Sequence, residues 1–175
     1  MAIELQCLED APADLVRGVQ KLNLGALPVQ PPDFIYRRSV RETALRLCWA
    51  AVAVDGDDAC VAGAVLAELE PDLKKSGPAT AVVQIRTLAV APHFRRQGVG
   101  QKLLETVIER TRALAEQDAD GQPRIRGLSL HVHEPNDDAR RLYERLGFQE
   151  VARLEGYYRR LKPATAIAMH LPLVE

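Results

Sequence analysis

The chain has 175 residues, of which 47% are apolar and 27% charged, which is typical of a soluble globular protein with one core. Its formal net charge of −1 argues against general binding to nucleic acids or anionic membranes, and no run of about 18 apolar residues is present to span a bilayer. The start, MAIELQCLED, lacks a basic-then-apolar signal pattern. We therefore expect one domain over residues 1–175 in the cytoplasm, with the nucleus as a second location.

The N-terminal part predicts two helices separated by a stiff loop. Four apolar residues share helical spacing: Leu15, Val16, Val19 and Leu22. The segment LGALPVQPPDF follows, and its glycine and three prolines predict a rigid, extended loop. A short helix is expected over 36–45.

The middle of the chain predicts strands. Two apolar runs, LCWAAVAV and CVAGAVLAEL, are separated by the turn DGDDA and predict an antiparallel hairpin. After a loop, PDLKKSGPAT, the strand AVVQIRTLAV ends before Pro92. The three cysteines, Cys7, Cys48 and Cys60, form no CxxC pair, so neither a zinc site nor a redox pair is indicated. Cys48 and Cys60 are expected to be buried small hydrophobic residues.

The C-terminal part alternates helices and strands. A helix after Gly98 has one apolar stripe, made by Leu103, Leu104, Val107, Ile108 and Leu114, and EQDADGQPR ends it. The alternation in GLSLHVH predicts a strand. A second helix, NDDARRLYERLGF, is capped by Asn136 and ended by Gly147, and two strands follow. This order predicts an α+β (or α/β) fold with a mixed, mostly antiparallel sheet of six or seven strands.

One motif indicates phosphate binding. Residues 95–100 read R-x-x-G-x-G between a strand and a helix, where glycines admit close backbone approach and the helix start offers free N–H groups. No Gly-Lys-Ser/Thr follows, so this is not a Walker loop. A dinucleotide turn requires glycine where Leu103 stands. The alternative interpretation is a plain helix start with two exposed arginines.

Two longer stretches, TLAVAPHFRRQGVGQKLLE and LHVHEPNDDARRLYERLGF, resemble the GCN5-related N-acetyltransferase (GNAT) superfamily over residues 45–171. The resemblance implies a sheet with a splayed central strand pair that holds acetyl-CoA, with the coenzyme pyrophosphate on the N–H groups of the loop. The coenzyme-binding residues that it implies are Leu88, Ala89, Val90, Arg95, Arg96, Gln97, Gly98, Val99, Gly100, Gln101, Asn136, Ala139 and Tyr143.

A closer resemblance lies in LNLGALPVQ, TLAVAPHFRR, LHVHEPND and GYYRRLKPATA, which are similar to the San-type catalytic subunits of N-terminal acetyltransferase E. That family acetylates the α-amine of proteins that begin with methionine and an apolar residue. It also joins the larger N-terminal acetyltransferase A complex on ribosomes. The resemblance therefore implies peptide N-termini as partners, and that complex and the ribosome as further partners.

The implied reaction needs a base for the α-amine, whose pKa near about 7.7–8.0 makes a modest base sufficient, through a water if necessary. His131 is the candidate, because it shares one face of its strand with Ser129 and His133 and matches the family's catalytic histidine. Backbone N–H groups near Leu88 and Val90 would polarise the thioester carbonyl. A structural histidine, or a His-x-His metal pair that lacks an obvious third ligand, remain alternatives for His131. No metal is expected.

The chain departs from the family at two positions near this base. Gln84 stands in place of a tyrosine base, and glutamine can orient a water but cannot accept a proton. Arg86 stands in place of a methionine and is expected to face the peptide. Tyr143 matches a tyrosine whose hydroxyl donates to the leaving thiolate, although a plain core tyrosine would give the same pattern.

The resemblance also implies a peptide-binding site. Leu27, Pro28 and Val29 match a loop that lines the methionine pocket, with Pro31 in place of a tyrosine. The opposite wall would be formed by Tyr157, Tyr158 and Leu161, unless the tyrosines only cover a sheet edge. Two other functions stay open: acetylation of small amines such as polyamines, and a weakly active subunit that anchors in a ribosomal acetyltransferase complex.

Overall fold

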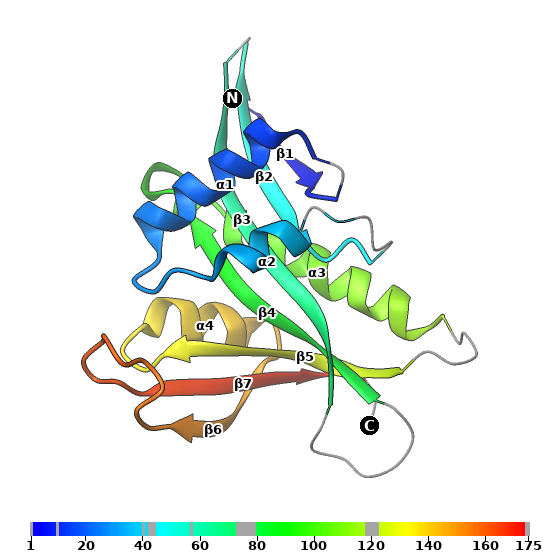
Figure 1. Cartoon of the computed structure of the whole chain (residues 1–175), viewed down its shortest axis with the longest axis vertical. Coiled ribbons are helices and arrows are strands. Elements are labelled where there is room, and N and C mark those ends of the chain that lie inside the picture. Colours follow the sequence, from blue (N-terminus) through cyan, green and yellow to red (C-terminus); the bar gives the residue numbers. More distant parts are fainter. Residues whose placement is uncertain are drawn as a thin grey trace. The chain divides into compact units, whose positions relative to one another are not determined.

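The computed structural model describes residues 2–9, 11–39, 41, 45–56, 58–72, 80–117 and 123–173 (Figure 1). Within these ranges the helices are α1 (Ala13–Ala26), α2 (Asp33–Ser39), α3 (Val99–Ala115) and α4 (Asp137–Arg145), with a 3-10 turn at Pro92–Phe94. The strands are β1 (Ala2–Cys7), β2 (Trp49–Asp55), β3 (Asp58–Pro71), β4 (Thr80–Val90), β5 (Arg124–His133), β6 (Gln149–Leu154) and β7 (Ala166–Pro172). No helix of this described part is long and apolar enough to cross a membrane.

The described strands form one seven-stranded sheet in the order β1-β2-β3-β4-β5-β7-β6. The pairs β1–β2, β2–β3, β5–β7 and β6–β7 are antiparallel, and β4–β5 is parallel. The last register pair of β4 with β5 is Ile85 with Leu130, although β4 runs on to Val90 and β5 to His133. The predicted mixed sheet with a splayed central pair is thereby confirmed.

The strand β1 was absent from the sequence-based prediction. It pairs with β2 from Ala2↔Val54 to Cys7↔Trp49, and its residues alternate between exposed and half-buried. The alternation of Ile3, Leu5 and Cys7 is the signal that would have found it. It is weak, because an edge strand buries only part of one face.

The chain groups into two compact units, Met1–Glu68 with Arg86–Arg110, and Leu69–Ile85 with Thr111–Glu175. In the first unit, α1 and α2 lie across β2 and β3 (Figure 1). The core beneath them contains Leu8, Val19, Ile35, Tyr36, Cys48, Ala50, Val52, Ala64 and Leu66. Burial of these apolar side chains is the main source of stability for this unit.

Two helix boundaries differ from the prediction. α1 continues through Gly25 to Ala26, because a single glycine costs a helix only about 1 kcal/mol, whereas the ring of Pro28 forces Leu27 into an extended conformation (φ −102°, ψ 132°). α2 covers Asp33–Ser39 rather than 36–45, since Pro32 precedes its first turn and Asp33 lies at its positive end. Parts of the loops predicted at DGDDA, PDLKKSGPAT and EQDADGQPR, and of 36–45, lie outside the described residues.

The hairpin of β2 and β3 forms as predicted, with an irregular register at Ala51/Val52. Cys48 is buried, its Sγ lies 3.2 Å from Ala67 O, and burial raises the pKa of its thiol to about 12. The expectation that Cys60 is buried was wrong. Residues 58–60 are all exposed, because this end of β3 extends past the apolar core.

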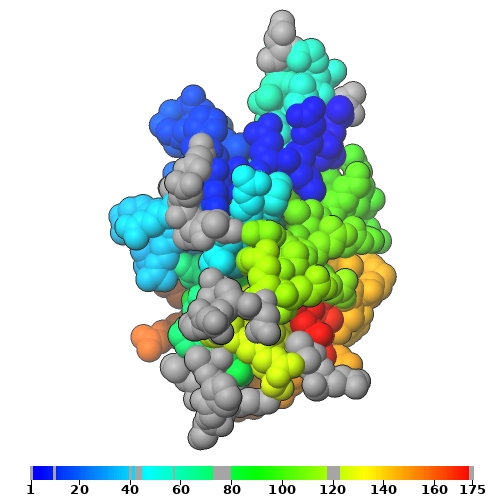
Figure 2. All heavy atoms as spheres, turned by 90° about the vertical axis from the view of Figure 1, so that its right-hand side faces the viewer, coloured from blue at the N-terminus to red at the C-terminus, as the bar shows by residue number. Residues whose placement is uncertain are grey.

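α3 shows the predicted amphipathic pattern. Leu103, Leu104, Val107 and Ile108 are buried, and Leu114 is half-buried. Its outer surface, green to yellow-green in Figure 2, faces solvent. At its first turn α3 packs closely on β3, since a Cβ built at Gly63 would lie 2.9 Å from Val99 Cγ1 and 3.1 Å from Ala89 O. Gly63 therefore permits the close approach of helix and strands.

In the second unit the strands β5, β7 and β6 lie beside α4 (Figure 1). Leu128, Leu130 and Val132 of β5 are buried, whereas Ser129, His131 and His133 point to the other face. This confirms the alternation predicted for GLSLHVH. The predicted caps of α4 are also present: the Asn136 side chain accepts a bond from Ala139 N–H, and Gly147 follows the helix with φ +92°.

Candidate active site

The turn before α3 has a backbone conformation that is typical of anion-binding turns. Arg96 and Gly98 both have positive φ, +63° and +80°. The first intrahelical bond runs from Lys102 N–H to Gly98 O, so the N–H groups at the start of α3 have no intrahelical acceptor. Consecutive N–H groups in such a turn, together with the helix dipole, favour a bound phosphate.

Side chains hold this turn against the end of β4. Arg95 Nε donates to Val90 O at 3.1 Å, and Gln97 Nε2 donates to His93 O at 2.7 Å. Ala91 N–H donates to Ala62 O at 2.8 Å, which ties the end of β4 to β3. The first unit thus brings the strand end and the predicted phosphate turn together, as the motif requires. Of the two arginines that precede Gln97, Arg95 therefore has a structural role, since its side chain bonds to the backbone at the end of β4.

The predicted residues of α4 lie in the second unit. Asn136 Oδ1 accepts from Ala139 N–H at 3.2 Å, so this side chain is the N-cap of its helix. Tyr143 is buried, packs at 5.9 Å against the ring of Phe148, and burial raises the pKa of its hydroxyl. Both features agree with a structural role, and Tyr143 stays protonated at neutral pH, as a hydrogen-bond donor must.

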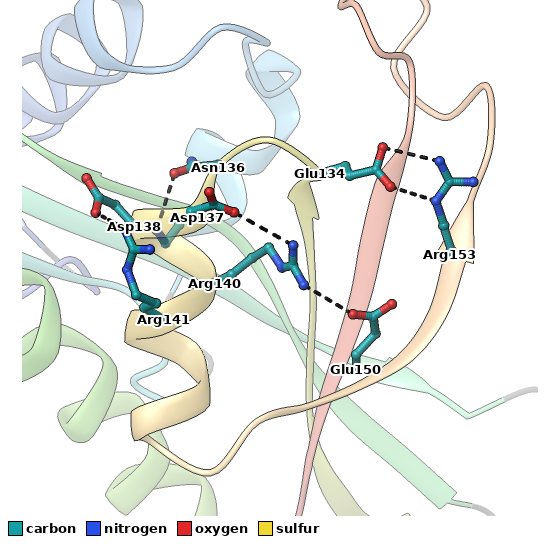
Figure 3. Close-up of polar contacts among 9 residues, drawn as sticks. Glu134, Asn136, Asp137, Asp138, Arg140, Arg141, Glu150 and Arg153 are labelled. Carbon is teal, nitrogen blue, oxygen red and sulfur yellow. Dashed lines mark hydrogen bonds and ion pairs between the residues drawn. The ribbon is translucent and has the colours of Figure 1, made fainter.

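Ion pairs surround α4 (Figure 3). Arg140 lies between Asp137 and Glu150, at 3.8 and 3.4 Å, and links the helix to β6. Arg153 Nε and Nη2 donate to the two oxygens of Glu134, at 2.6 and 3.3 Å, and this pair lowers the pKa of the Glu134 carboxyl. Arginines of the basic C-terminal third are thus used in local pairs, which individually contribute little because they are exposed.

A cluster of two histidines and two tyrosines occupies the polar face of β5. His131 Nδ1 lies 3.0 Å from Tyr157 Oη, and the rings are 4.8 Å apart. Tyr157 and Tyr158 pack edge to face at 4.9 Å, and Tyr158 packs at 5.4 Å on His133. Burial, followed by the charge of the Tyr157 hydroxyl, raises the pKa of Tyr158 to about 12. These four residues are hereafter called the His–Tyr cluster.

The two histidines of the cluster differ in chemistry. His133 Nε2 lies 2.7 Å from Pro163 O, and since a carbonyl only accepts, this nitrogen carries a proton and donates. His131 instead meets a hydroxyl, which can accept as well as donate. His131 is also the more exposed of the two residues, whereas His133 is half-buried.

Gln84 lies in register with Ser129 across the parallel pair β4–β5, and on the next strand Ser129 is in register with His170. Registered neighbours point to the same face of a sheet, so Gln84 shares the face of His131. Ser129 Oγ and His170 Nδ1 are 2.9 Å apart. Gln84 is only 7% exposed. This polar row was missed by sequence reasoning, because nothing local in AIAMHL ties His170 to Ser129.

The predicted peptide residues of the first unit lie on the loop after α1. Leu27 N–H donates to Asn23 O at 2.9 Å, and Val29 is 44% exposed. Arg86 Nε donates to Glu68 Oε2 at 3.0 Å, and Glu68 Oε1 accepts from Arg38 Nη1 at 3.2 Å. The position that is methionine in the family therefore carries an ion pair in this chain.

The predicted peptide residues of the second unit lie between β6 and β7. Tyr158 N–H donates to Ala164 O at 2.8 Å, and Leu161 N–H donates to Tyr158 O at 3.3 Å. These bonds fold the segment back on itself and hold Tyr157 and Tyr158 over β5. The assignment of individual residues to coenzyme, peptide or proton transfer stays a prediction.

Among the described residues, no group of three or more His, Cys, Asp or Glu side chains is placed to hold a metal ion. In the first unit, the end of β4 leads into the predicted phosphate turn at the start of α3. In the second unit, a histidine lies exposed on β5. The turn has the backbone that binding of a phosphate-bearing donor requires. The model of the acetyltransferase (GNAT) family matches residues 19–148, and the chain belongs to this family.

The chain is also similar to individual N-terminal acetyltransferases. It is 28% identical over 159 residues to the "Probable N-acetyltransferase san" of Drosophila melanogaster, covering 91% of this chain and 76% of that one. A chain in the crystal structure of "the NatC complex bound to Gag peptide and CoA" has a similar fold, with a TM-score of 0.81 at 23% identity over 99% of this chain and all of that one. The structure of "Arabidopsis thaliana Naa50 in complex with bisubstrate analogue CoA-Ac-MVNAL" is similar with a TM-score of 0.73 at 22% identity. The match covers 98% of this chain and 99% of that one. The resemblance to San-type proteins is thus confirmed.

Proposed function

We propose that this protein transfers the acetyl group of acetyl-CoA to the α-amine of polypeptides that begin with methionine followed by an apolar residue. The observation that carries the proposal is the exposed His131, held at 3.0 Å by Tyr157 within the His–Tyr cluster. The San relative supports this function at modest identity, and the analogue bound to the Arabidopsis protein begins with Met-Val.

Acetyl-CoA is the donor, and its pyrophosphate would lie on the N–H groups of residues 97–101. The end of β4, from Leu88 to Val90, would supply backbone N–H groups that polarise the thioester carbonyl. The protonated hydroxyl of Tyr143 would donate a hydrogen bond to the sulfur as the C–S bond breaks. These residues bind and orient the donor.

The amine must lose a proton as its nitrogen bonds to the acetyl carbon. Its pKa of about 7.7–8.0 lies close to neutral pH, so His131 Nε2 needs only to take that proton, directly or through a water. Gln84 lies on the same face and would orient the water by hydrogen bonds. The thiolate is released, and the proton held by His131 returns to the solvent.

Gly98→Ala is expected to raise the KM for acetyl-CoA about ten-fold or more, because Gly98 has φ +80° and a Cβ there strains the turn that presents the N–H groups. The Cβ itself meets no atom within 4 Å, so the protein should still fold. Initial rates at varied acetyl-CoA measure the effect. An unchanged KM would remove the turn from the coenzyme site.

One assay tests the proposed function: release of thiol from acetyl-CoA with a Met-Leu peptide, with a polyamine, and without acceptor. Turnover with the Met-Leu peptide alone is expected. Turnover with the polyamine alone would make this a small-amine acetyltransferase. Binding of acetyl-CoA without turnover on either acceptor would contradict the proposal.

A second candidate function is a weakly active subunit that anchors in a larger complex. The buried Gln84 favours it, because a glutamine at this position cannot serve as a base. The similar NatC structure is that of a complex. We propose the N-terminal acetyltransferase A complex and the ribosome as partners, in the cytoplasm and nucleus. Co-purification of these proteins with a tagged chain would support this role, whereas a lone, fully active chain would not.

A further inference from the structure

The end of α1 is closed by a side chain in addition to the backbone. Leu27, which follows the helix, is extended instead of left-handed, and the last turn of α1 contains no basic residue. The final carbonyl groups of a helix need donors from elsewhere. Gln30 supplies them: its Nε2 donates to Asn23 O at 3.1 Å and to Leu27 O at 2.9 Å.

These two bonds turn the segment from Leu27 to Gln30 into a closed loop. The side-chain amide of Gln30 and the backbone N–H of Leu27 both donate to Asn23 O, at 3.1 and 2.9 Å, and Pro28 and Val29 lie between these two residues in the chain. Pro28 has a fixed φ, which removes further freedom. The loop is therefore held at both ends while Val29 remains exposed.

The residue whose carbonyl anchors the loop is buried and hydrogen-bonded. Asn23 is completely buried, and its Nδ2 donates to Tyr36 Oη of α2 at 3.0 Å. Burial is the main reason why the pKa of Tyr36 is raised, so this hydroxyl stays protonated. Gln30 thus fastens an exposed loop to a buried point that α1 and α2 share.

We propose that Gln30 is a positioning residue for the acceptor peptide: its amide holds the Leu27–Val29 loop in the conformation that receives the first side chain of the substrate. This inference rests on the proposed function and on the resemblance to San-type proteins, by which that loop would line the methionine pocket. A loop ordered before binding raises affinity because less conformational entropy is lost on binding. Gln30 itself need not touch the substrate.

The sharpest test is Gln30→Glu. The side chains have the same shape, but a carboxylate has no donor and would face two carbonyl oxygens at the negative end of α1. We expect the KM for a Met-Leu peptide to rise about five-fold or more, while kcat and the KM for acetyl-CoA stay within about two-fold. Gln30→Ala removes the donor without repulsion, so its effect should be smaller.

The matched controls are Gln6→Glu and Gln6→Ala, which make the same changes at an exposed position of β1 and should leave all three constants unchanged. An unaltered peptide KM in Gln30→Glu would overturn the inference. So would an equal rise in both KM values, which would show a general structural effect. A wild-type protein that acetylates no peptide would refute the proposed function instead.

Hydrogen exchange gives a readout that does not depend on activity. The Leu27 amide, bonded to Asn23 O, should exchange faster in Gln30→Glu than in the wild type, whereas amides of β2 should not change. Equal exchange of the Leu27 amide in the two proteins would show that Gln30 does not hold the loop.

Discussion

His131→Ala is expected to lower kcat for a Met-Leu peptide about 100-fold, with little change in the KM for acetyl-CoA. A positioned base contributes about 10²–10⁴-fold to such a reaction, and the low end applies because the α-amine is only weakly basic. His131 belongs to the cluster on β5, whereas the phosphate turn belongs to the start of α3. Binding of the donor should therefore survive the loss of the imidazole.

The neighbouring His133→Ala is the matched control. His133 lies on the same strand and face, but its Nε2 donates to Pro163 O and has no lone pair to offer. Its replacement should leave kcat within a few-fold of the wild type. Steady-state rates at saturating acetyl-CoA measure both variants. Equal kcat values for His131→Ala and the wild type would exclude His131 as the base.

Gly127→Ala is expected to have the largest effect on stability, lowering the free energy of unfolding by about 3 kcal/mol or more. A Cβ at this position would lie 2.3 Å from Leu171 O and 2.8 Å from the ring of His170. The carbonyl belongs to the backbone of β7, so relief requires β5 and β7 to separate. Equilibrium denaturation in urea, followed by circular dichroism, measures the change.

Gly25→Ala provides the contrast for this prediction. Gly25 lies in α1, and a Cβ there meets nothing within 4 Å. Alanine is the better helix former, so this variant should be unchanged or more stable by up to about 1 kcal/mol. If both variants unfolded at the same urea concentration, the close contact of β5 and β7 at Gly127 would not be a constraint on the sequence.

Local patterns predicted the elements that have strong periodicity or strong end signals. The stripe of α3 repeats at helical spacing over several turns, and α4 carries both its cap, Asn136, and its terminating Gly147. The polar face of β5 followed from its period of two. These features depend on neighbours within a few residues, which is the range over which a sequence pattern acts.

The failures have two physical causes. Gly25 was expected to end α1, but a glycine only weakens a helix, and Pro28 sets the end. Cys60 lies in an apolar run, yet it is exposed because the hairpin extends beyond the core. β1 is an edge strand with weak alternation. For α1 a nearby proline decided the outcome. For Cys60 and β1 the outcome depended on how far the core extends along the strand, which the local pattern leaves open.

The sequence by itself determined the backbone of the predicted phosphate turn, because Gly98, which tolerates positive φ, and the start of α3 are adjacent in the chain. Only the tertiary structure decided the surroundings of the candidate base. It brings Tyr157 to His131 and His170 to Ser129. Within the first unit it also brings Glu68 to Arg86. These pairs join separate strands and loops, so strand order and register, rather than any local pattern, set which side chains meet.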